Sequence, residues 1–535
     1  MAQPDWSPFA CMMAAAFGYA LFWKGLLYFK LAKIRFLISL IWFGVIQSFH
    51  LNWLRSDRYV GGYIYIFFFL LLLGLAIQFA FICLFIRKNL SFYKILGISG
   101  GWVLCEWSRL FIFSGYSWNP IGIALSGNLY GMQFASIFGI FGMSFWVFFT
   151  NLLALQILNL FLWHRCILWL IMVGTPYLFG WLNVTFHKQS LEKDSHVLST
   201  LLVQTAIYPE YKISLNGSIP IPPEKQWERI LTMLSFYTNT QPDLIVLSEG
   251  VVPYGAHFPI YSVEDVKDRM NIFFHQKQVY PTSLSSYVGN VYWAQAIANI
   301  FSADVIIGLE DFDIHEEKVK QAYNAAFLVH PFSEKLERYE KRILVPMGEY
   351  IPFQWCRAFL QKYGIKDSFC PGKEAKIFET NHAPIGVSIC YEETYGNLMR
   401  ANRLKGAQLL VNLTNDVWYP HSRLPIIHFL HGRLRAIEAG VPLLRCCNTG
   451  VTCGLDSLGR LVGILEYESP KKYASAEVLM LSLPLYTYST LYTQVGDLPL
   501  IIFCSVFFVW ICASALRTRK SFFINDIEVL PLHKN

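Results

Sequence analysis

Three reactive side chains adjoin apolar runs in the middle of the chain. Glu249 follows the run Leu244–Leu247, and Cys390 follows the run Ile385–Ile389. Lys341 lies where a charged segment meets an apolar stretch interrupted by prolines. A buried strand in a rigid sheet can hold the group at its end in a fixed geometry. A carboxylate, an ammonium and a thiol held together in this way can carry out nucleophilic catalysis, with the thiol as nucleophile.

The segment around Cys390 is typical of a strand that ends in a sharp turn. An apolar strand stops at the thiol, polar residues follow, and a helical pattern begins near Gly396. At such a turn we expect backbone N–H groups to lower the thiol pKa from about 8.5 and to bind a developing oxyanion. A buried cysteine at a strand end, with a purely structural role, is the alternative.

Glu249 and Lys341 fit complementary roles beside that thiol. A glutamate delivered by an apolar strand can act as a general base when burial raises its pKa from about 4.3. The segment from Lys341 to Glu349 contains Pro346 and Gly348, and such a stiff loop can aim both charged groups. We expect Lys341 to stabilise an oxyanion and Glu349 to hold that lysine. A solvated glutamate and a surface charge cluster are the alternatives.

The surrounding elements alternate between short apolar runs and a helical pattern. We expect strands and a helix at the following positions: Leu201 to Thr205, Trp227 to Tyr237 (the helix), Leu244 to Leu247, Val305 to Leu309, Ile385 to Ile389, and Leu409 to Leu413. This alternation is typical of an α/β domain. A central block of roughly 300 residues is long enough to bury one full core.

The chain as a whole is too apolar for an ordinary soluble protein. Hydrophobic residues make up 54% of the 535 residues, charged residues 15%, and the mean hydropathy is +0.37. Seven runs approach the roughly 20 residues that cross a bilayer. They are Phe9 to Tyr28, Phe36 to Trp53, Tyr63 to Ile86, Ile95 to Phe113, Met132 to Leu160, Cys166 to Val184, and Leu498 to Leu516.

Basic residues between these runs predict the topology. Clusters around Lys30, Lys88, Arg165 and Arg519 mark cytoplasmic flanks, so the central block lies outside the cytoplasm. The same alternation places the N-terminus outside and predicts a further span upstream. Inside the fourth run, two charged residues one helical turn apart, Glu106 and Arg109, are expected to satisfy each other, with a functional role as the alternative.

Two other classes of function lack support in the sequence. The net charge of +7 comes from basic residues beside apolar runs, without a basic helix, so no nucleic-acid partner is expected. The central block has no paired CxxC motifs, and no metal site is expected. A disulfide between Cys356 and Cys370 is a minor alternative. Cys446 and Cys447 are expected in the core, with reactivity as the alternative.

Several motifs together resemble those of the nitrilase superfamily and, more narrowly, of the apolipoprotein N-acyltransferases. The motifs are Tyr339-Glu-Lys-Arg-Ile-Leu-Val-Pro-Met-Gly-Glu-Tyr-Ile-Pro, Ile389-Cys-Tyr-Glu, Leu413-Thr-Asn-Asp-Val-Trp-Tyr, Gly432-Arg-Leu-Arg-Ala-Ile-Glu-Ala-Gly, and Asn448-Thr-Gly-Val-Thr. The resemblance also covers the multi-span first part and the single last span. It implies an α-helical membrane bundle followed by an extracytoplasmic α/β nitrilase-like αββα sandwich.

The resemblance also implies specific residue roles. The catalytic triad would be Glu249, Lys341 and Cys390, with supporting roles for the following residues: Glu349, Tyr391, Glu392 and Trp227. The implied divisions are a multi-span region (1–186), a catalytic domain (187–496), a transmembrane helix (497–516) and a cytoplasmic tail (517–535). Trp227 matches a family tryptophan after the first strand, although a core aromatic on a helix is equally expected.

The implied reaction is acyl transfer in the bacterial inner membrane, with the catalytic domain in the periplasm. An acyl chain would pass from a phospholipid, phosphatidylethanolamine in the family, through a thioester on Cys390 to the amine of a lipoprotein diacylglyceryl-cysteine. No cofactor is implied. Apolar segments from Val251 to Ile260 and from Tyr350 to Tyr363 are expected to be lipid-facing arms or packed loops. The rival interpretations are a membrane-tethered amidase and a non-catalytic transporter or receptor.

Overall fold

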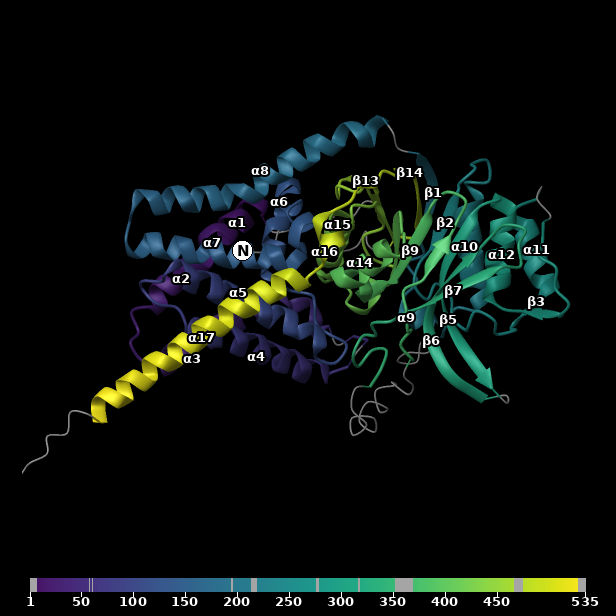
Figure 1. Ribbon diagram of the computed structural model, residues 1–535. Coiled ribbons are helices and arrows are strands. Elements are labelled where there is room, and N and C mark those ends of the chain that lie inside the picture. Colours follow the sequence, from purple (N-terminus) through teal and green to yellow (C-terminus); the bar gives the residue numbers. More distant parts are fainter. Residues whose placement is uncertain are drawn as a thin grey trace, which may run out of the picture.

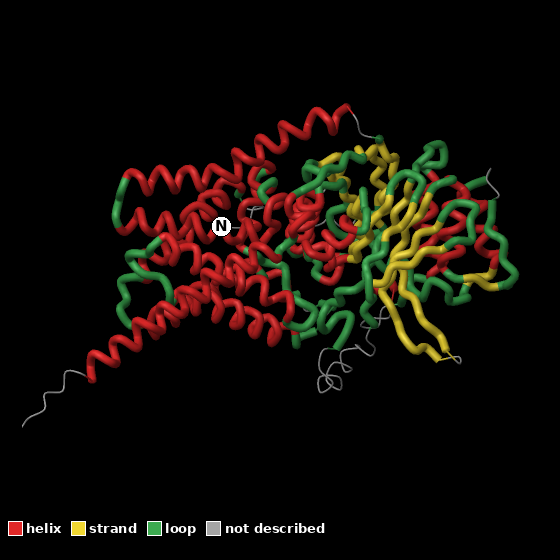
Figure 2. Tube along the Cα trace, in the orientation of Figure 1, coloured by secondary structure: helices red, strands yellow, loops and turns green. Residues whose placement is uncertain are grey.

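A bundle of long helices lies beside a domain built on two sheets (Figures 1 and 2). The computed structural model describes residues 7–56, 58–59, 61–193, 196–212, 219–275, 279–315, 318–351, 369–465 and 475–527. The first part of the chain and its last helix form the bundle, and the segment between them forms the sheet domain. The catalytic α/β domain and the membrane-type helices predicted from the sequence are therefore both present.

The bundle and its connections contain these elements: α1 (Pro8–Met13), η1 (Ala14–Gly18), α2 (Tyr19–Leu26), α3 (Ala32–His50), η2 (Asn52–Arg55), α4 (Ile64–Cys83), α5 (Phe92–Ser108), η3 (Arg109–Phe111), η4 (Ile121–Gly127), α6 (Leu129–Met132), α7 (Ala135–Asn159), α8 (Trp163–Lys193), and α17 (Leu498–Ile527). Within the described residues, six helical stretches are long and apolar enough to cross a membrane. The remaining predicted run, Ile95 to Phe113, forms α5, whose 17 residues rise about 25 Å before the chain continues into η3.

Helix α7 occupies the centre of the bundle, and α8 lies at its edge. The candidate span of α7 is 83% buried, whereas that of α8 is 11% buried. The side chains fit this difference, since α7 carries polar groups, Thr150 and Asn151, that donate to the Ala15 carbonyl inside the bundle. Many large apolar side chains on α3, α4, α8 and α17 are exposed, as expected for surfaces that face lipid.

The sheet domain contains these elements: β1 (Val197–Gln204), α9 (Pro209–Lys212), α10 (Pro223–Ser235), β2 (Leu244–Leu247), β3 (Tyr261–Ser262), α11 (Val263–Phe273), β4 (Tyr287–Val288), α12 (Asn290–Phe301), β5 (Asp304–His315), β6 (Lys318–Val329), β7 (Leu336–Glu340), β8 (Ile377–Glu379), β9 (Pro384–Ile389), η5 (Cys390–Thr394), α14 (Gly396–Leu404), β10 (Leu409–Thr414), η6 (Asp416–Trp418), α15 (Leu424–Ala439), β11 (Leu443–Cys447), β12 (Cys453–Leu455), β13 (Leu461–Ile464), β14 (Glu477–Pro484), and α16 (Leu491–Val495).

Two six-stranded sheets pack face to face in this domain. Their strand orders are β14-β1-β2-β5-β6-β7 and β13-β12-β11-β10-β9-β8. The three parallel strands of each sheet are buried on both faces, so they read as continuous apolar runs. One core lies between the sheets, a second under α10 and α12, and a third under α14 and α15. The layers are therefore α, β, β, α, as the resemblance implies.

Cys446 and Cys447 lie in strand β11 and are fully buried. The Cys446 thiol points between the sheets and donates to the carbonyls of Val203 and Val246. The expectation that these cysteines belong to the core is thus confirmed, and the reactive alternative has no exposed sulfur to act on. Cys370 is a free thiol, and its expected disulfide partner Cys356 lies outside the described residues.

Candidate active site

Three strand ends bring the predicted catalytic residues together. Glu249 follows β2, Lys341 follows β7 and Cys390 follows β9. The Lys341 ammonium lies 3.2 Å from Glu249 Oε1. The charges of both residues act on the Cys390 thiol. The arrangement places a carboxylate, an ammonium and a thiol within one small site, as the sequence predicts.

Glu349 completes the coordination of the lysine. Its Oε1 lies 2.8 Å from Lys341 Nζ, and its Oε2 accepts the backbone N–H of Val345 at 2.8 Å. The bond from Val345 to Glu349 joins two residues of the same short loop and so stiffens the loop between Lys341 and Glu349. The lysine side chain is only 1% exposed, so both carboxylates hold it in a nearly dry setting. Glu349 thus contacts the lysine that it is predicted to support, and its role in catalysis stays a prediction.

The two carboxylates also determine the charge state of Lys341. Burial alone would lower the pKa of this ammonium, but Glu249, Glu349 and Cys390 outweigh burial and raise the pKa well above its usual range. The lysine is therefore a fixed positive charge and cannot serve as a base at neutral pH. An ammonium in this position can stabilise negative charge that develops near Cys390.

Asn324 belongs to the site and was not predicted. It lies in the middle of β6, and its side-chain amide donates to both Glu249 Oε1 and Glu349 Oε1, at 2.8 Å each. It thus contacts the same two oxygens as Lys341. The sequence gives only a weak indication, an asparagine just before the apolar run Ala325–Val329, because its position near Glu249 depends on how β6 pairs with its neighbours.

Lys212 is a second unpredicted residue near the base. Its Nζ donates to the carbonyl of Gly250, next to Glu249. Burial lowers the pKa of Lys212 to about 8, although Glu249 and Glu310 oppose this shift. Burial also raises the pKa of Glu310. Lys212 therefore adds a positive group behind Glu249, from a short helix that sequence patterns do not link to the site.

The backbone of Cys390 has the geometry expected of a sharp turn after a strand. Its φ is +50°, a left-handed value that is costly for a non-glycine residue and is often found at functional sites. The turn η5 begins at this residue, and α14 begins at Gly396, where the sequence predicts a helix. Strand β9 and the neighbouring strand β10 hold the turn in place.

The expectation that the thiol pKa is lowered was wrong. Burial and the charge of Glu249 raise the pKa of Cys390 well above its usual range, and Lys341 and the backbone N–H of Asn415 offset only part of this effect. The resting cysteine is therefore a neutral thiol. It needs a base at the moment of attack, and Glu249 is placed to be that base.

Glu392 ties the lysine loop to the nucleophile. Its carboxylate accepts the Tyr339 hydroxyl at 2.8 Å, the backbone N–H of Arg342 at 2.6 Å and the backbone N–H of Ile389 at 2.8 Å. It is fully buried, and burial raises its pKa while these donors lower it. One carboxylate thereby joins the residue before Cys390 to the residue after Lys341, which is a positioning role.

Tyr391 faces the membrane part of the molecule. Its hydroxyl donates to the carbonyl of Gly115 at 2.9 Å, and its ring stacks on Trp118 at 5.4 Å. Tyr395 adds a bond of 3.0 Å to the carbonyl of Ser114. The loop 113–118, between η3 and η4, therefore binds the segment that carries the nucleophile through two hydrogen bonds and one ring contact.

Trp227 lies in a different place from the other predicted site residues. It is fully buried under the outer face of the first sheet, where it stacks on Trp293 at 5.4 Å. Its indole N–H donates to Asn290, whose amide binds the carbonyls of Pro253 and Tyr254 in the segment after Glu249. Trp227 is thus a core aromatic residue on a helix, and it reaches the site only through Asn290.

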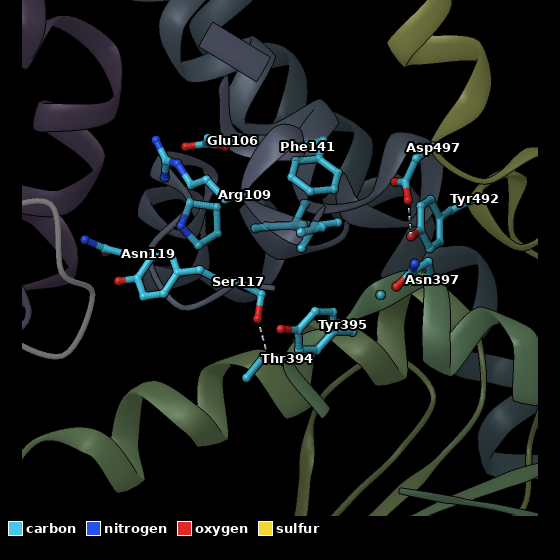
Figure 3. A pocket seen from close by; sticks show the side chains of 15 residues that line it. Glu106, Arg109, Ser117, Asn119, Phe141, Thr394, Tyr395, Asn397, Tyr492 and Asp497 are labelled. Atoms are coloured by element: carbon cyan, nitrogen blue, oxygen red, sulfur yellow. Dashed lines mark hydrogen bonds between the residues drawn. The ribbon is translucent and has the colours of Figure 1, made fainter. Parts of the chain in front are cut away.

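A pocket lies between the segment that follows Cys390 and the membrane helices, and residues of both parts line it (Figure 3). Glu106 and Arg109 line one end of it, Tyr492 and Asp497 the other, and Tyr395 lies between them. The predicted direct pairing of the two intramembrane charges is not present. Glu106 instead accepts from Trp102 at 2.9 Å and from the backbone of Ile121 at 2.8 Å. Arg109 donates to Gln78 at 2.8 Å.

The two predicted apolar arms differ in what the structure describes. In the first, Tyr254 and Phe258 are each 50% exposed and stacked on one another, while Val251 and Ala256 are buried. This segment is a loop packed on the core with an exposed aromatic pair. The second arm includes Phe353, Trp355 and Phe359, which lie outside the described residues. Among the described residues, no group of three or more metal-ligating side chains is placed to hold a metal ion.

The two packed sheets and the Glu-Lys-Cys cluster define a protein of the nitrilase superfamily attached to membrane helices. Residues 216–478 match the Carbon-nitrogen hydrolase family, and residues 3–153 match the Apolipoprotein N-acyltransferase N-terminal domain. An apolipoprotein N-acyltransferase of Chlamydia pneumoniae is 36% identical over 94% of this chain and 94% of its own. That of Chlamydia trachomatis is 37% identical over 95% and 93%, respectively. The chain therefore belongs to the apolipoprotein N-acyltransferase family.

Proposed function

We propose that this protein transfers an acyl chain from a phospholipid to the N-terminal amine of lipoproteins through a thioester on Cys390. The observation that carries the proposal is the cluster in which Lys341 is held by Glu249 and Glu349 beside a neutral thiol. This cluster provides a nucleophile, a base and a fixed positive charge for an oxyanion. Membership of the family supplies the substrate class.

In the first half of the reaction, Glu249 accepts the Cys390 proton as the sulfur attacks the ester carbonyl of the phospholipid. Lys341 and the backbone N–H of Tyr391 stabilise the oxyanion. The ester C–O bond then breaks, and the proton passes from Glu249 to the departing lysophospholipid oxygen. The enzyme is left with a thioester at Cys390 and a neutral lysophospholipid as the first product.

In the second half, the free amine of a diacylglyceryl-cysteine attacks the thioester carbonyl. Glu249 takes a proton from the attacking nitrogen, and the C–S bond breaks as the amide forms. The thiolate of Cys390 recovers that proton, which restores the starting state. Both half-reactions pass through an oxyanion at the same place, so one set of donors serves both.

The contact between the site and the bundle fits substrates that stay in a membrane. Exposing an acyl chain to water costs about 0.8 kcal/mol per CH₂ group. The loop 113–118 binds the nucleophile segment directly, and Tyr63 at the start of α4 packs on Met347 in the lysine loop. These contacts hold the nucleophile segment against the membrane helices, which favours a substrate whose chains stay in the apolar layer.

The test is intact-mass analysis of Cys390 peptides after the detergent-purified protein is incubated with phosphatidylethanolamine, the donor that the resemblance implies. We expect an acyl adduct that hydroxylamine removes, and no adduct in Cys390→Ala. Addition of a diacylglyceryl peptide with a free N-terminus should discharge the adduct onto its amine. Folded protein that forms no adduct with several phospholipids would favour the amidase or the binding-only interpretation.

We also propose that the bundle lies in the bacterial inner membrane with the catalytic domain in the periplasm, as the basic flanks of the helices favour. Leu284 in the catalytic domain and Lys88 between α4 and α5 are both exposed. A membrane-impermeant maleimide should label Leu284→Cys in spheroplasts, but not Lys88→Cys until the membrane is opened. The opposite labelling pattern would reverse the proposed orientation.

A further inference from the structure

Two side chains hydrogen-bond to the carbonyl oxygen of Cys390 from behind the site. Asn412 Nδ2 lies 3.3 Å from this oxygen, and His428 Nε2 lies 3.1 Å from it. The carbonyl of Cys390 and the N–H of Tyr391 belong to the same peptide group. Whatever polarises this carbonyl therefore also changes the strength of the N–H donor on its other side.

His428 is surrounded by acceptors at both ring nitrogens. Its Nδ1 lies 3.0 Å from Asp416 Oδ1, and its Nε2 lies 3.3 Å from Glu393 Oε2 in addition to the Cys390 carbonyl. A ring nitrogen facing only oxygens that accept must carry a hydrogen. His428 is fully buried. Because a carbonyl oxygen can only accept, Nε2 is the nitrogen that donates to Cys390, while Nδ1 faces Asp416.

The surroundings of these two residues hold them in one orientation. Asp416 opens η6 directly beyond β10, and Glu393 is bound by the buried guanidinium of Arg445 at 2.8 Å. The Asn412 side-chain oxygen accepts the hydroxyl of Thr414 at 2.6 Å, which leaves its NH₂ group facing Cys390. The donors to the carbonyl are therefore fixed before any substrate binds.

We propose that His428 and Asn412 are positioning residues that strengthen the oxyanion donor of the site by polarising the peptide group between Cys390 and Tyr391. The inference rests on the proposed acyl transfer. Hydrogen bonds in a chain reinforce each other by roughly 10–30% per bond. The same two bonds hold Cys390 in its left-handed conformation.

The kinetic test uses two replacements of His428 in the full-length protein in detergent. His428→Gln retains a neutral donor, and His428→Phe retains bulk without a donor. We expect the rate of Cys390 acylation by phosphatidylethanolamine to fall about twofold in the first and about fivefold in the second, because 10–30% of a charge-assisted hydrogen bond is worth less than about 1 kcal/mol. Discharge of the thioester by the amine should fall in parallel, because it passes through the same oxyanion, while the KM for the phospholipid stays unchanged.

His431 provides a matched control. It lies on the same helix, is equally buried, and donates to the Trp118 carbonyl at 3.3 Å rather than to Cys390. Because glutamine can keep the bond to the Trp118 carbonyl, His431→Gln should change the acylation rate by less than about 1.5-fold. A loss in His431→Gln equal to that in His428→Gln would mean that helix packing explains the effect, and the proposal would be wrong.

A spectroscopic measurement separates polarisation from general damage. The acyl-enzyme is prepared with a donor labelled with carbon-13 at the ester carbonyl, and the thioester carbonyl stretch is read by difference infrared spectroscopy. A stronger oxyanion donor lowers this frequency, so wild type should give a lower band than His428→Gln. Identical bands, or full acylation rates in His428→Phe, would overturn the proposal. Wild-type protein that forms no thioester would instead overturn the proposed function.

Discussion

At the scale of single residues, Asn324 shows how much of the site depends on neutral groups. Its amide lies between two carboxylates that already share one ammonium, and each bond is 2.8 Å long. Two carboxylates this close repel one another unless donors separate them. Asn324 thereby holds the Glu249 and Glu349 carboxylates in place beside one another.

Replacement of this asparagine should slow the chemistry more than it weakens the fold. A hydrogen bond to a charged group contributes about 1.5–3 kcal/mol, so Asn324→Ala should slow Cys390 acylation between about tenfold and a hundredfold. The measurement is the initial rate of adduct formation by mass spectrometry. Asn402 is the control, because its buried amide donates at 3.1 Å to the Val387 carbonyl, away from the carboxylates. An equal loss in Asn402→Ala would attribute the effect to stability.

The reactivity of Cys390 should depend on pH in a way that reports its raised pKa. Below that pKa the thiolate fraction grows about tenfold per pH unit, so alkylation by iodoacetamide should keep rising through about pH 9. Glu249 helps to raise the pKa. Glu249→Gln should therefore lower the pKa and speed alkylation at a given pH, although it abolishes acylation. A plateau near neutral pH in wild type would show a preformed thiolate.

The residues that sequence reasoning found share one property. Glu249, Lys341 and Cys390 adjoin apolar runs, where a reactive group at a strand end is conspicuous. Asn324 and His428 lie inside elements, β6 and α15, and only their pairing with distant strands and turns brings them to the site. The raised thiol pKa was missed for a related reason, since burial by distant segments does not follow from a local turn.

At the scale of elements, the loop 113–118 couples the bundle to the nucleophile. Gly115 has a φ of +94°, and a Cβ at this position would lie 2.8 Å from both the Leu110 carbonyl oxygen and the Tyr395 hydroxyl. The tyrosine hydroxyl is itself bonded to the carbonyl of Ser114. A side chain at Gly115 would thus strain the backbone. It would also displace the Tyr395 hydroxyl and break its hydrogen bond to the Ser114 carbonyl, which holds the end of η5.

Gly115→Ala should accordingly impair catalysis through the loop. A strained backbone position costs about 1–3 kcal/mol, and we expect a loss in acylation rate of about tenfold or more. Gly62→Ala is the control, because it lies in another loop of the bundle and a Cβ there meets nothing within 4 Å. Rates that agree between the two variants would mean that the loop 113–118 does not steady the nucleophile.

The elements themselves were largely predictable, and their limits were not. The run Leu244–Leu247 is strand β2 at the predicted residues, because a fully buried parallel strand reads as an uninterrupted apolar run. Helix α5 ends at Ser108 rather than at Phe113, as η3 and the turn after it redirect the chain toward Tyr391. The role of Trp227 could not be assigned from the sequence, because a core aromatic residue and an active-site aromatic residue on a helix have the same sequence pattern.

At the scale of the whole molecule, the last helix, α17, packs along α5 from the first part of the chain (Figure 1). Small residues let helices approach closely in a membrane. A Cβ on Gly100 would lie 2.9 Å from the Cα of Cys504, and one on Gly97 would lie 2.7 Å from the carbonyl oxygen of Phe507. Because α5 leads into the loop 113–118, packing of the last helix supports the nucleophile from a distance.

Gly100→Leu should separate these two helices. Overpacking costs about 1–3 kcal/mol, so thermal stability in detergent should fall and acylation should slow. Cys504 is fully buried in the wild type and should become reactive to maleimide only when α17 moves away from α5. Gly74→Leu on α4 is the control, since a Cβ there meets nothing within 4 Å. If Cys504 stays protected in Gly100→Leu while acylation falls, the support must run through α5 alone, and if neither changes, the two helices are not closely packed.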